Sequence, residues 1–274
     1  MPAGELSSIE RHEKQVYLDK HATGKSRLDR RGWTLQQRIA LASRFLADHG
    51  HGSALAGQVT ALAQDGTYWT QRYGRGMEEV TASGLVRVNA NLEVLEGRGQ
   101  ANPANRFHSY IYRAKPDAKA IVHTHPPHAS ALAMIREPLV PSHMDTVALW
   151  DDVAHLADWP GVPFGDEEGE IIATALGDKR AILLAHHGLL TVGASIEEAA
   201  VLAVIFENAA RLQLLAMSAG MVRPLPEREA RGPPVRVSSG LLCFVVRLLC
   251  APTFGARPEL PELGRCTGSG DSGT

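Results

Sequence analysis

The sequence predicts one α/β domain in which helices flank a mixed or largely antiparallel sheet. Three observations indicate this class: helical and strand periodicities interleave along the chain, a β-hairpin pattern interrupts them, and no internal repeat is visible. Of the 274 residues, 44% are hydrophobic and 21% are charged, which is ordinary for a globular protein. A core of that size needs neither disulfides nor a structural metal for stability.

The first expected element is a helix that starts at Thr34 and ends at His49-Gly50. Thr34-Leu-Gln-Gln37 has the form of a capping box, and apolar residues follow at helical spacing. A strand is expected at Val59–Leu62. Leu85–Val88 and Leu92–Leu95 each alternate apolar and polar residues around a short loop, which predicts a β-hairpin.

The second half of the chain continues with alternating helices and buried strands. Ser195-Ile-Glu-Glu198 has the form of a second capping box, and it opens a long helix that runs to about Ala219. The other expected elements are helices at Phe107–Ala114, His128–Ile135 and Glu167–Leu176, and strands at Ala118–His123 and Ala181–Ala185.

The two ends of the chain differ from its centre. Residues 1–31 are polar and aperiodic, which predicts a flexible arm, and residues 223–274 are rich in Pro, Arg, Gly and Ser, which predicts a loosely ordered tail. All three cysteines lie in that tail, a poor disulfide framework, and no signal peptide or membrane span is visible. A cytoplasmic location is therefore expected. The net charge of −2 offers no basic surface, so neither nucleic acid nor a membrane is expected as a partner.

Two histidine clusters follow the two apolar strands. His123 and His125 are two residues apart at the end of one strand, so both imidazoles point to the same face. A third nitrogen comes from His187, or from His186, at the end of the other strand. Three protein ligands with open positions are typical of a catalytic metal site. The first expectation is Zn²⁺, with Mn²⁺, Fe²⁺ or Co²⁺ as alternatives; the competing interpretation is that these histidines bond to backbone groups.

Several segments resemble the signature segments of the class II aldolase/adducin superfamily, and the resemblance runs in order from about Thr34 to Met221. Thr81-Ala-Ser-Gly84 also resembles that family's Thr-x-Ser-Gly turn. The signature-like segments are Asn105-Arg-Phe-His108, Arg113-Ala-Lys-Pro-Asp117, Ala120-Ile-Val-His-Thr-His125 and Leu183-Leu-Ala-His-His-Gly-Leu-Leu190.

The resemblance implies a three-layer α/β/α fold with a central, mainly antiparallel sheet, and a catalytic domain over residues 32–222. It implies that His123, His125 and His187 bind one divalent metal ion. It also implies a homo-oligomer, with a tetramer favoured and active sites between subunits. The family contains sugar-phosphate aldolases and epimerases, dehydratases, decarboxylases of aromatic or heteroaromatic acids, and non-catalytic adducin domains.

The chain departs from the sugar-phosphate aldolases in one segment. Those members have Ser-Ser-Glu before Arg-Phe-His, where this chain has Asn102-Pro103-Ala104. Ala104 cannot transfer a proton, and Pro103 has neither a hydroxyl nor a backbone N–H to offer an anion. The family's Gly-Asn-x-Ser turn is approximated by Gly57-Gln-Val-Thr60, in which Thr60 keeps a hydroxyl. A phosphorylated sugar is therefore a poor fit, whereas decarboxylation needs only a metal and a proton source.

Roles for the remaining candidates follow from this chemistry. His108, His128 and His143 are candidate proton donors, because histidine titrates near neutral pH. Arg106 is expected either to pair with a substrate carboxylate or to form a structural salt bridge. Substrate contacts are expected from Thr60, Thr81, Ser83 and Gly84, the last three of which form either an anion cradle or simply a tight turn.

The sequence thus predicts a divalent-metal-dependent carbon–carbon lyase that decarboxylates a hydroxy-substituted aromatic or heteroaromatic acid, or a keto acid. Ser142-His-Met-Asp145 also resembles a segment of the decarboxylases. One alternative is an aldolase or epimerase acting on a sugar or sugar phosphate, with Glu168, Asp166 or Asp145 as its acid/base. The other is a non-catalytic, adducin-like interaction domain.

Overall fold

The structure, a computed structural model, describes residues 33–54, 56–159, 161 and 165–227. The expected arm over residues 1–31 and most of the expected tail, including its cysteines, lie outside the described residues. Within the described part, eight strands form one sheet in the order β4-β3-β2-β1-β5-β8-β7-β6. Every neighbouring pair is antiparallel except β6 and β7, which α5 connects as a parallel crossover.

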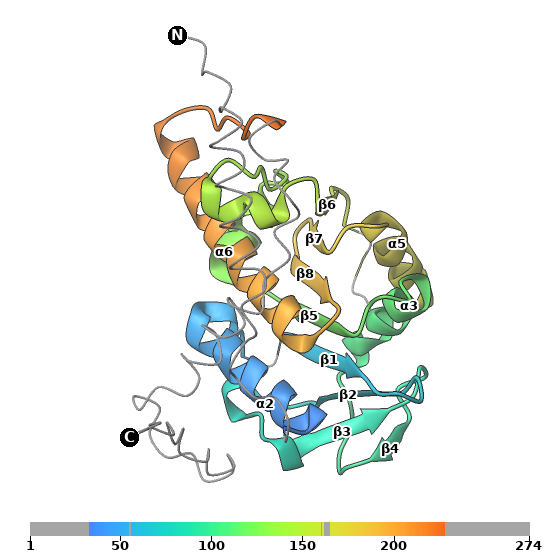
Figure 1. Ribbon diagram of the computed structural model, residues 1–274. Helices are drawn as coiled ribbons and strands as arrows, with labels where there is room; N and C mark the ends of the chain where they lie inside the picture. The colour runs from blue at the N-terminus through green and yellow to red at the C-terminus, as the bar shows by residue number, and fades with distance from the viewer. Residues whose placement is uncertain (1–32, 55, 160, 162–164, 228–274) are drawn as a thin grey trace, which may run out of the picture.

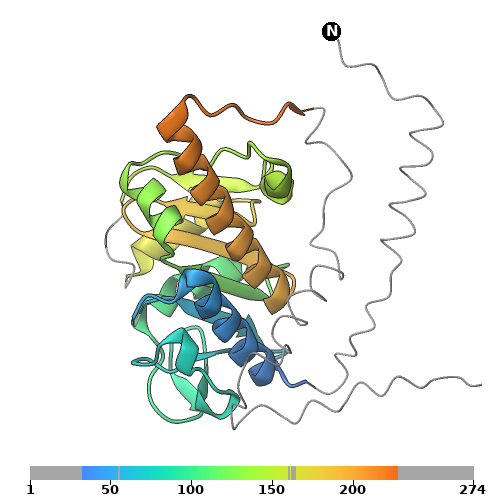
Figure 2. The same cartoon turned by 90° about the vertical axis from the view of Figure 1, so that its left-hand side faces the viewer.

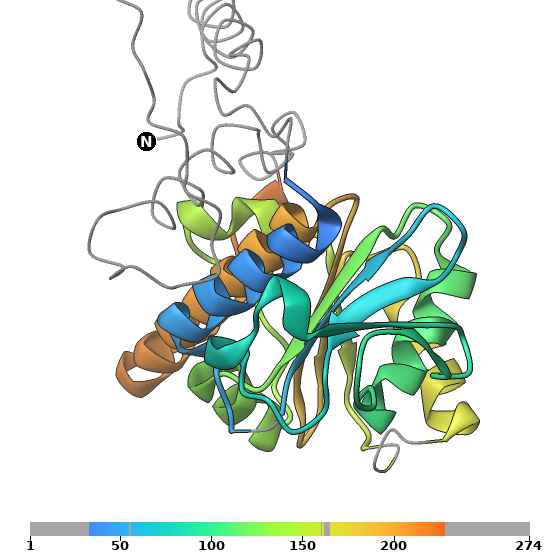
Figure 3. The same ribbon diagram turned by 90° about the horizontal axis from the view of Figure 1, so that it is seen from below.

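The helices lie on both faces of this sheet, as Figures 1 and 3 show. On one face are α2 (Leu35–Leu46), α4 (Pro127–Met134) and α6 (Ile196–Ala219); on the other are α3 (Arg106–Ala114) and α5 (Asp166–Leu176). The strands are β1 (Gln58–Leu62), β2 (Tyr68–Gln71), β3 (Leu85–Val88), β4 (Val94–Glu96), β5 (Ala120–Thr124), β6 (Val153–Leu156), β7 (Ala181–Leu184) and β8 (Gly188–Gly193). Short helical turns are η1 (Ala47–His51), η2 (Met77–Glu79), η3 (Ala82–Gly84), η4 (Pro103–Asn105) and η5 (Met144–Leu149).

The alternation of side chains along the central strands produces two separate apolar layers. On β5, Val122 points to the α2/α6 side and packs with Leu183 of β7 and Phe206 of α6. Its neighbour Ile121 points to the other side and packs with Phe107 of α3. The expected three-layer α/β/α architecture with a mainly antiparallel sheet is therefore confirmed.

The first expected capping box is present, whereas only one of the two hydrogen bonds of the second is formed. The Thr34 hydroxyl accepts from the Gln37 backbone N–H at 3.2 Å, and the Gln37 side chain accepts from the Thr34 N–H at 2.9 Å. At α6, Ser195 does accept from the Glu198 N–H. The Glu198 carboxylate, however, accepts from the Ala194 N–H and from Arg180 instead of returning to Ser195. An ion-pair partner from elsewhere in the fold has replaced the local bond.

Three strands were not predicted, and one was misplaced. β2 and β6 are short, and β8 directly follows β7 through a turn without the usual Asn-Gly signal. In the β3–β4 hairpin, Leu92 adopts φ +65° and belongs to the turn, so the second strand starts at Val94 and not at Leu92. A residue in the left-handed region cannot continue a strand, which is the physical reason for the shift.

Helix α6 is long and apolar enough to cross a membrane, with a mean hydropathy of 1.5 over the best window, and half of that window is buried in the protein. Figure 2 looks onto α6 and α2, which lie side by side on the sheet. Glu207 and Gln213 are buried polar residues on the same helix, and both bond to the segments around α4. The apolar side chains of α6 thus pack in the core between this helix and the sheet.

The pairing directions bring several chain segments to one edge of the sheet. Because β1 and β8 are both antiparallel to β5, their first residues lie beside its last: Gln58 pairs with His123, and Leu189 pairs with Thr124. β7 ends beside the start of β8, where Leu184 pairs with Gly188. The segments that follow β5 and β7 therefore meet at this edge, although more than 50 residues separate them in the chain.

We expect Leu183→Ala to lower the free energy of unfolding by about 2–5 kcal/mol, because the fully buried Leu183 side chain would leave a cavity between β7 and α6. Leu95→Ala is the matched control, since Leu95 is 48% exposed and its loss should change stability by less than about 0.5 kcal/mol. Urea unfolding of both variants measures the difference. Equal stability of the two variants would contradict the assigned core.

Candidate metal centre

Three histidine rings converge at this edge of the sheet. His123 is the fourth residue of β5, His125 follows the end of β5, and His187 lies in the turn between β7 and β8. The Nε2 atom of His123 lies 3.0 Å from Nε2 of His125 and 3.2 Å from Nε2 of His187. One ring nitrogen from each lies within 4.8 Å of the other two. The structure thus brings together all three expected metal ligands and selects His187 over the exposed His186.

The β7–β8 turn explains why His187 can reach the cluster. The His187 backbone N–H donates to the Leu184 carbonyl at 3.1 Å, which closes a tight turn, and His186 takes φ +56° at its centre. Gly188 follows because nothing larger fits: a Cβ atom there would lie 2.5 Å from the Thr124 carbonyl oxygen and 2.7 Å from the His125 ring. Glycine therefore lets the backbones of β5 and β8 approach until their histidines face one another.

One hydrogen bond fixes the protonation of the central ring. The Nδ1 atom of His123 lies 2.9 Å from the Leu189 carbonyl oxygen. A carbonyl can only accept, so Nδ1 carries the proton and Nε2 presents its lone pair to His125 and His187. A metal-binding histidine is held in this way, with its second nitrogen bonded to a carbonyl or carboxylate. The donor set therefore fits a divalent cation.

The surroundings keep all three rings uncharged. Burial, together with the neighbouring histidines, holds the pKa of His123 well below its usual range, and burial lowers the pKa of His125. Burial is also the main cause that lowers the pKa of His187 to about 3, with His125 adding to the shift. Neutral imidazole is the form that binds a metal. Among the described residues the cluster includes no carboxylate, so a bound ion would keep open positions.

Aromatic rings border the cluster. Phe107 of α3 meets His123 edge-on, with ring centroids 5.1 Å apart and an interplanar angle of 88°. Trp159, in the segment after β6, meets His187 in the same manner at 4.9 Å and 88°. His123 is buried whereas His125 and His187 are half-buried, so the cluster opens to solvent on the side of the latter two.

His51, which is not among the candidate residues named from the sequence, supports the cluster from the opposite face of β5. Its Nδ1 atom lies 2.8 Å from the hydroxyl oxygen of Thr124, the residue between His123 and His125. His51 is completely buried, and burial lowers its pKa to about 3. The bond holds the end of β5 to η1. Since His51 stands between two glycines in a polar stretch, nothing local in the sequence signals this contact.

Of the expected proton donors, His108 is buried beneath the cluster. Its Nδ1 lies 2.8 Å from the Thr60 hydroxyl, which also bonds to the Tyr112 hydroxyl at 2.8 Å. Burial lowers the pKa of His108 to about 3, and its Nε2 has no hydrogen-bond partner in the described part of the chain. Thr60, expected to contact substrate, is thus fully buried and bonded within the protein.

The other two candidate donors lie nearer the surface. The Nδ1 atom of His128 lies 2.6 Å from a carboxylate oxygen of Glu207, and 41% of the His128 side chain is exposed. Glu207 also accepts from the backbone N–H groups of His128 and Ala129, so a carboxylate of α6 caps the first turn of α4. His143 caps η5 and is 53% exposed. Among the described residues, neither ring forms a hydrogen bond with the cluster.

Arg106 is engaged within the protein. Its guanidinium donates to Asp166 at the start of α5 at 2.7 Å, and to the Ala90 carbonyl and the Asn91 side chain in the β3–β4 turn. The ion pair with Arg106 is also the main cause that lowers the pKa of the Asp166 carboxyl. Of the two roles expected for Arg106, the geometry favours the structural salt bridge.

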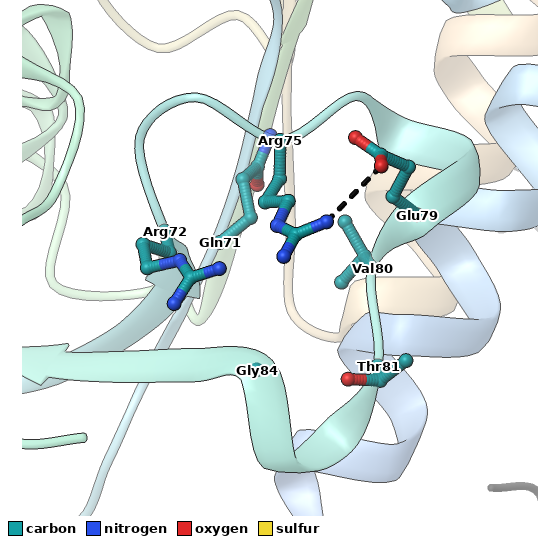
Figure 4. Close-up of a pocket in the computed structure, with 7 residues that line it drawn as sticks. All are labelled: Gln71, Arg72, Arg75, Glu79, Val80, Thr81 and Gly84. Atoms are coloured by element: carbon teal, nitrogen blue, oxygen red, sulfur yellow. Dashed lines mark hydrogen bonds and ion pairs between the residues drawn. The ribbon is translucent and has the colours of Figure 1, made fainter. Parts of the chain in front are cut away.

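The turn that contains Thr81, Ser83 and Gly84 lies next to a pocket of about 230 Å³ (Figure 4). Figure 4 shows the guanidinium groups of Arg72 and Arg75 directed into the gap between the β2–η2 loop and this turn. Arg75 pairs with Glu79 at 3.1 Å, and the positive charge of Arg72 also contributes to lowering the pKa of the Glu79 carboxyl. The lining residues are Gln71, Arg72, Arg75, Glu79, Val80, Thr81 and Gly84.

Comparison with known proteins identifies the family of this arrangement. Residues 37–214 match the model of the class II aldolase and adducin N-terminal domain. The 4-hydroxy-3-prenylphenylpyruvate oxygenase/4-hydroxy-3-prenylbenzoate synthase of Streptomyces roseochromogenus subsp. oscitans is 32% identical over 84% of this chain and 85% of its own. The decarboxylase NovR of Streptomyces niveus is 32% identical over 76% of this chain and 79% of its own. Among solved structures, the L-fuculose 1-phosphate aldolase of Glaciozyma antarctica PI12 superposes with a TM-score of 0.68 at 31% identity, over 78% and 89% of the two chains.

We expect Gly188→Ala to weaken metal binding and to destabilise the fold by about 1–3 kcal/mol, because the added methyl group would displace Thr124 and His125. Zinc titration against a competing chelator and urea unfolding measure the two effects. Gly52→Ala is the control, since its Cβ would lie no closer than 3.8 Å to any neighbouring atom. Wild-type zinc affinity in Gly188→Ala would contradict the close approach of β8 to His125.

The buried His108 predicts a pH dependence of stability. Its pKa is about 3 in the folded protein, against about 6.5 in the unfolded chain. Between these values only the unfolded chain binds the proton, so stability should fall as the pH falls below about 6.5. His108→Asn should flatten this slope between pH 4 and 6 by at most about 1.4 kcal/mol per pH unit. His143→Asn, which removes an exposed imidazole, should not flatten it; equal slopes in both variants would refute the assignment.

Proposed function

The chain belongs to the class II aldolase and adducin family, and from that membership we propose that it is a divalent-metal-dependent carbon–carbon lyase. The proposed reaction is decarboxylation of a hydroxy-substituted aromatic or heteroaromatic acid, or of a keto acid. The observation that supports it is the cluster of three neutral histidines without a carboxylate in the part of the chain described. Such a site favours a reaction that needs charge stabilisation and a proton source but no carboxylate base.

The chain's own residues would divide the work as follows. His123, His125 and His187 hold the ion, with Zn²⁺ as the first candidate and Mn²⁺, Fe²⁺ or Co²⁺ as alternatives. When bound, the ion supplies Lewis-acid stabilisation of the negative charge that develops on the substrate as CO₂ leaves. The Leu189 carbonyl fixes the His123 tautomer, and Gly188 permits the approach of the two strands.

The carbon that loses CO₂ must gain a proton. Of the three candidate donors, His108 is neutral at pH 7 and enclosed, which makes it a poor source. His128 and His143 retain that role in the proposal, because both rings are partly exposed. The buried Glu207 carboxylate orients the His128 ring, since it bonds to both the ring and the backbone of that residue.

Two features make the aldolase alternative a weaker fit than decarboxylation. Pro103 and Ala104 occupy the segment where the sugar-phosphate aldolases have their acid/base, and the Asn102 side chain there accepts from the Ala104 N–H. Asp166, a candidate for the acid/base of an aldolase, forms an ion pair with Arg106.

Since Arg106 is engaged, the pocket beside Thr81 and Gly84 becomes the proposed anion-binding surface. Arg72 and Arg75 bring two guanidinium groups to this pocket, against the single carboxylate of Glu79.

The names of two relatives are consistent with the proposed chemistry. One is named as a decarboxylase, and the other is named for a hydroxyphenylpyruvate and a hydroxybenzoate. The word oxygenase in the second name raises a specific alternative. Iron(II) oxygenases typically use two histidines and a carboxylate, whereas the cluster here consists of three histidines. A redox-neutral decarboxylation therefore fits better. We further propose that the enzyme acts on small molecules as a homo-oligomer.

The test combines metal analysis with CO₂ release. The purified full-length protein should retain about one divalent ion per chain, and a panel of hydroxy-aromatic and keto acids should include at least one that releases CO₂ with and without oxygen. His125→Ala should lose both the ion and at least about 100-fold of the activity. His49→Ala is the control, because the exposed His49 bonds to the Phe45 carbonyl and packs on the Phe45 ring within its own helix end.

Three results would count against the proposal. A protein that retains no divalent ion has no site for this chemistry. CO₂ release that strictly requires oxygen would favour an oxygenase. Cleavage of a sugar phosphate in the absence of any decarboxylation would favour the aldolase alternative.

A further inference from the structure

Trp159 is an exposed aromatic ring at the mouth of the histidine cluster. It follows β6, whose last residue, Leu156, pairs with Leu184 just before the β7–β8 turn. The indole ring stands edge-on to His187, with centroids 4.9 Å apart, and 38% of the residue is exposed. Because the cluster opens on the side of His125 and His187, a ring that borders His187 also borders the opening.

Contacts from a different element fix the segment before Trp159. Arg136, just after α4, donates from Nε to the Ala157 carbonyl at 2.8 Å and forms an ion pair with Asp158. Arg136 takes φ +58°, an uncommon conformation for a residue with a side chain. Two bonds to consecutive residues thus hold the chain immediately ahead of the indole, so the ring stands on an anchored segment.

The Trp159 indole offers apolar surface beyond the part that contacts His187. Tryptophan has a large apolar surface, and each part of it that is removed from water contributes to stability or to binding. Trp159 contacts His187 and leaves more than a third of its surface to solvent. Flat aromatic rings at a site mouth bind other rings in stacked or edge-to-face geometry.

We propose that Trp159 is the aromatic-recognition surface of the site, and that it selects substrates in which the carboxylate is attached to, or close to, an aromatic ring. The inference rests on the proposed function for the location of the reacting group, and it narrows the substrate class from aromatic or keto acids to aromatic ones. An aliphatic keto acid offers no ring to contact the indole. Trp159 is therefore a specificity-determining residue and takes no part in proton transfer.

The experiment uses two ligands that have the same α-hydroxy carboxylate group. Mandelate and lactate are both α-hydroxy acids, and they differ in carrying a phenyl or a methyl group. Calorimetric titration of the full-length, zinc-loaded protein should give mandelate binding at least about tenfold tighter than lactate binding. Trp159→Leu should lose about tenfold in mandelate affinity and leave lactate unchanged. Trp159→Phe, which keeps a ring, should stay within about threefold of wild type.

Zinc content and lactate affinity serve as internal controls for the cluster. Leu95→Ala removes an exposed apolar side chain at the opposite end of the sheet, on β4, and should bind both ligands as the wild type does. Equal loss of both ligands in Trp159→Leu would overturn the proposal, because Trp159 would then act only by supporting His187. Wild-type mandelate affinity in that variant, or no preference for mandelate in the wild type, would overturn it too.

The binding measurement is separate from the CO₂ assay, so the two proposals can fail independently. If the preference for mandelate disappears in Trp159→Leu but no acid releases CO₂, the role of Trp159 in recognition is supported and the proposed decarboxylase activity is refuted. If an aromatic acid releases CO₂ and its KM is unchanged in Trp159→Leu, the decarboxylase activity is supported and the role of Trp159 in recognition is refuted. If Trp159 acts in substrate recognition during turnover, the loss should appear mainly in KM and not in kcat.

Discussion

The hydrogen bond from the His123 ring to the Leu189 carbonyl is the contact on which the rest of the site depends. It exists because β5 and β8 are antiparallel neighbours whose register places Leu190 opposite His123. By fixing the proton on Nδ1, the bond turns the unprotonated Nε2 of His123 toward the other two rings. A shift of this register by one residue would turn the His123 side chain to the opposite face of the sheet and separate it from His125 and His187.

The remainder of the fold supports that register from both faces. On the α3 side, Phe107 packs against the His123 ring, and His108 bonds to Thr60 in β1. On the other side, His51 holds Thr124. These hydrogen bonds join buried polar groups on both faces of the sheet, while the Nε2 atoms of His51 and His108 have no hydrogen-bond partner in the described part of the chain. This arrangement suits a site that must hold three neutral nitrogens close together before any ion arrives.

Within a family that includes aldolases and decarboxylases, chemistry depends on the groups placed around the shared histidines. Here Ala104 has no side-chain group that can transfer a proton, and the Arg106 guanidinium is bonded to Asp166. The groups left facing outward differ in kind: Arg72 offers a positive charge, and Trp159 offers an apolar ring. They lie on opposite sides of the cluster along the sheet edge, so charge and aromatic recognition are separated in space.

The sequence by itself determined an α/β domain with helices that flank a mixed or largely antiparallel sheet, most of the helices and the shared face of His123 and His125, because periodicity and His-x-His spacing are local properties. It could not supply β2, β6 and β8, whose short runs are stable as strands only beside their neighbours. Nor could it decide between His186 and His187, since a left-handed turn residue is defined by the hairpin it closes. The positions of Trp159, His51 and Glu207 were likewise decided only by tertiary structure: each acts through a partner distant in the sequence.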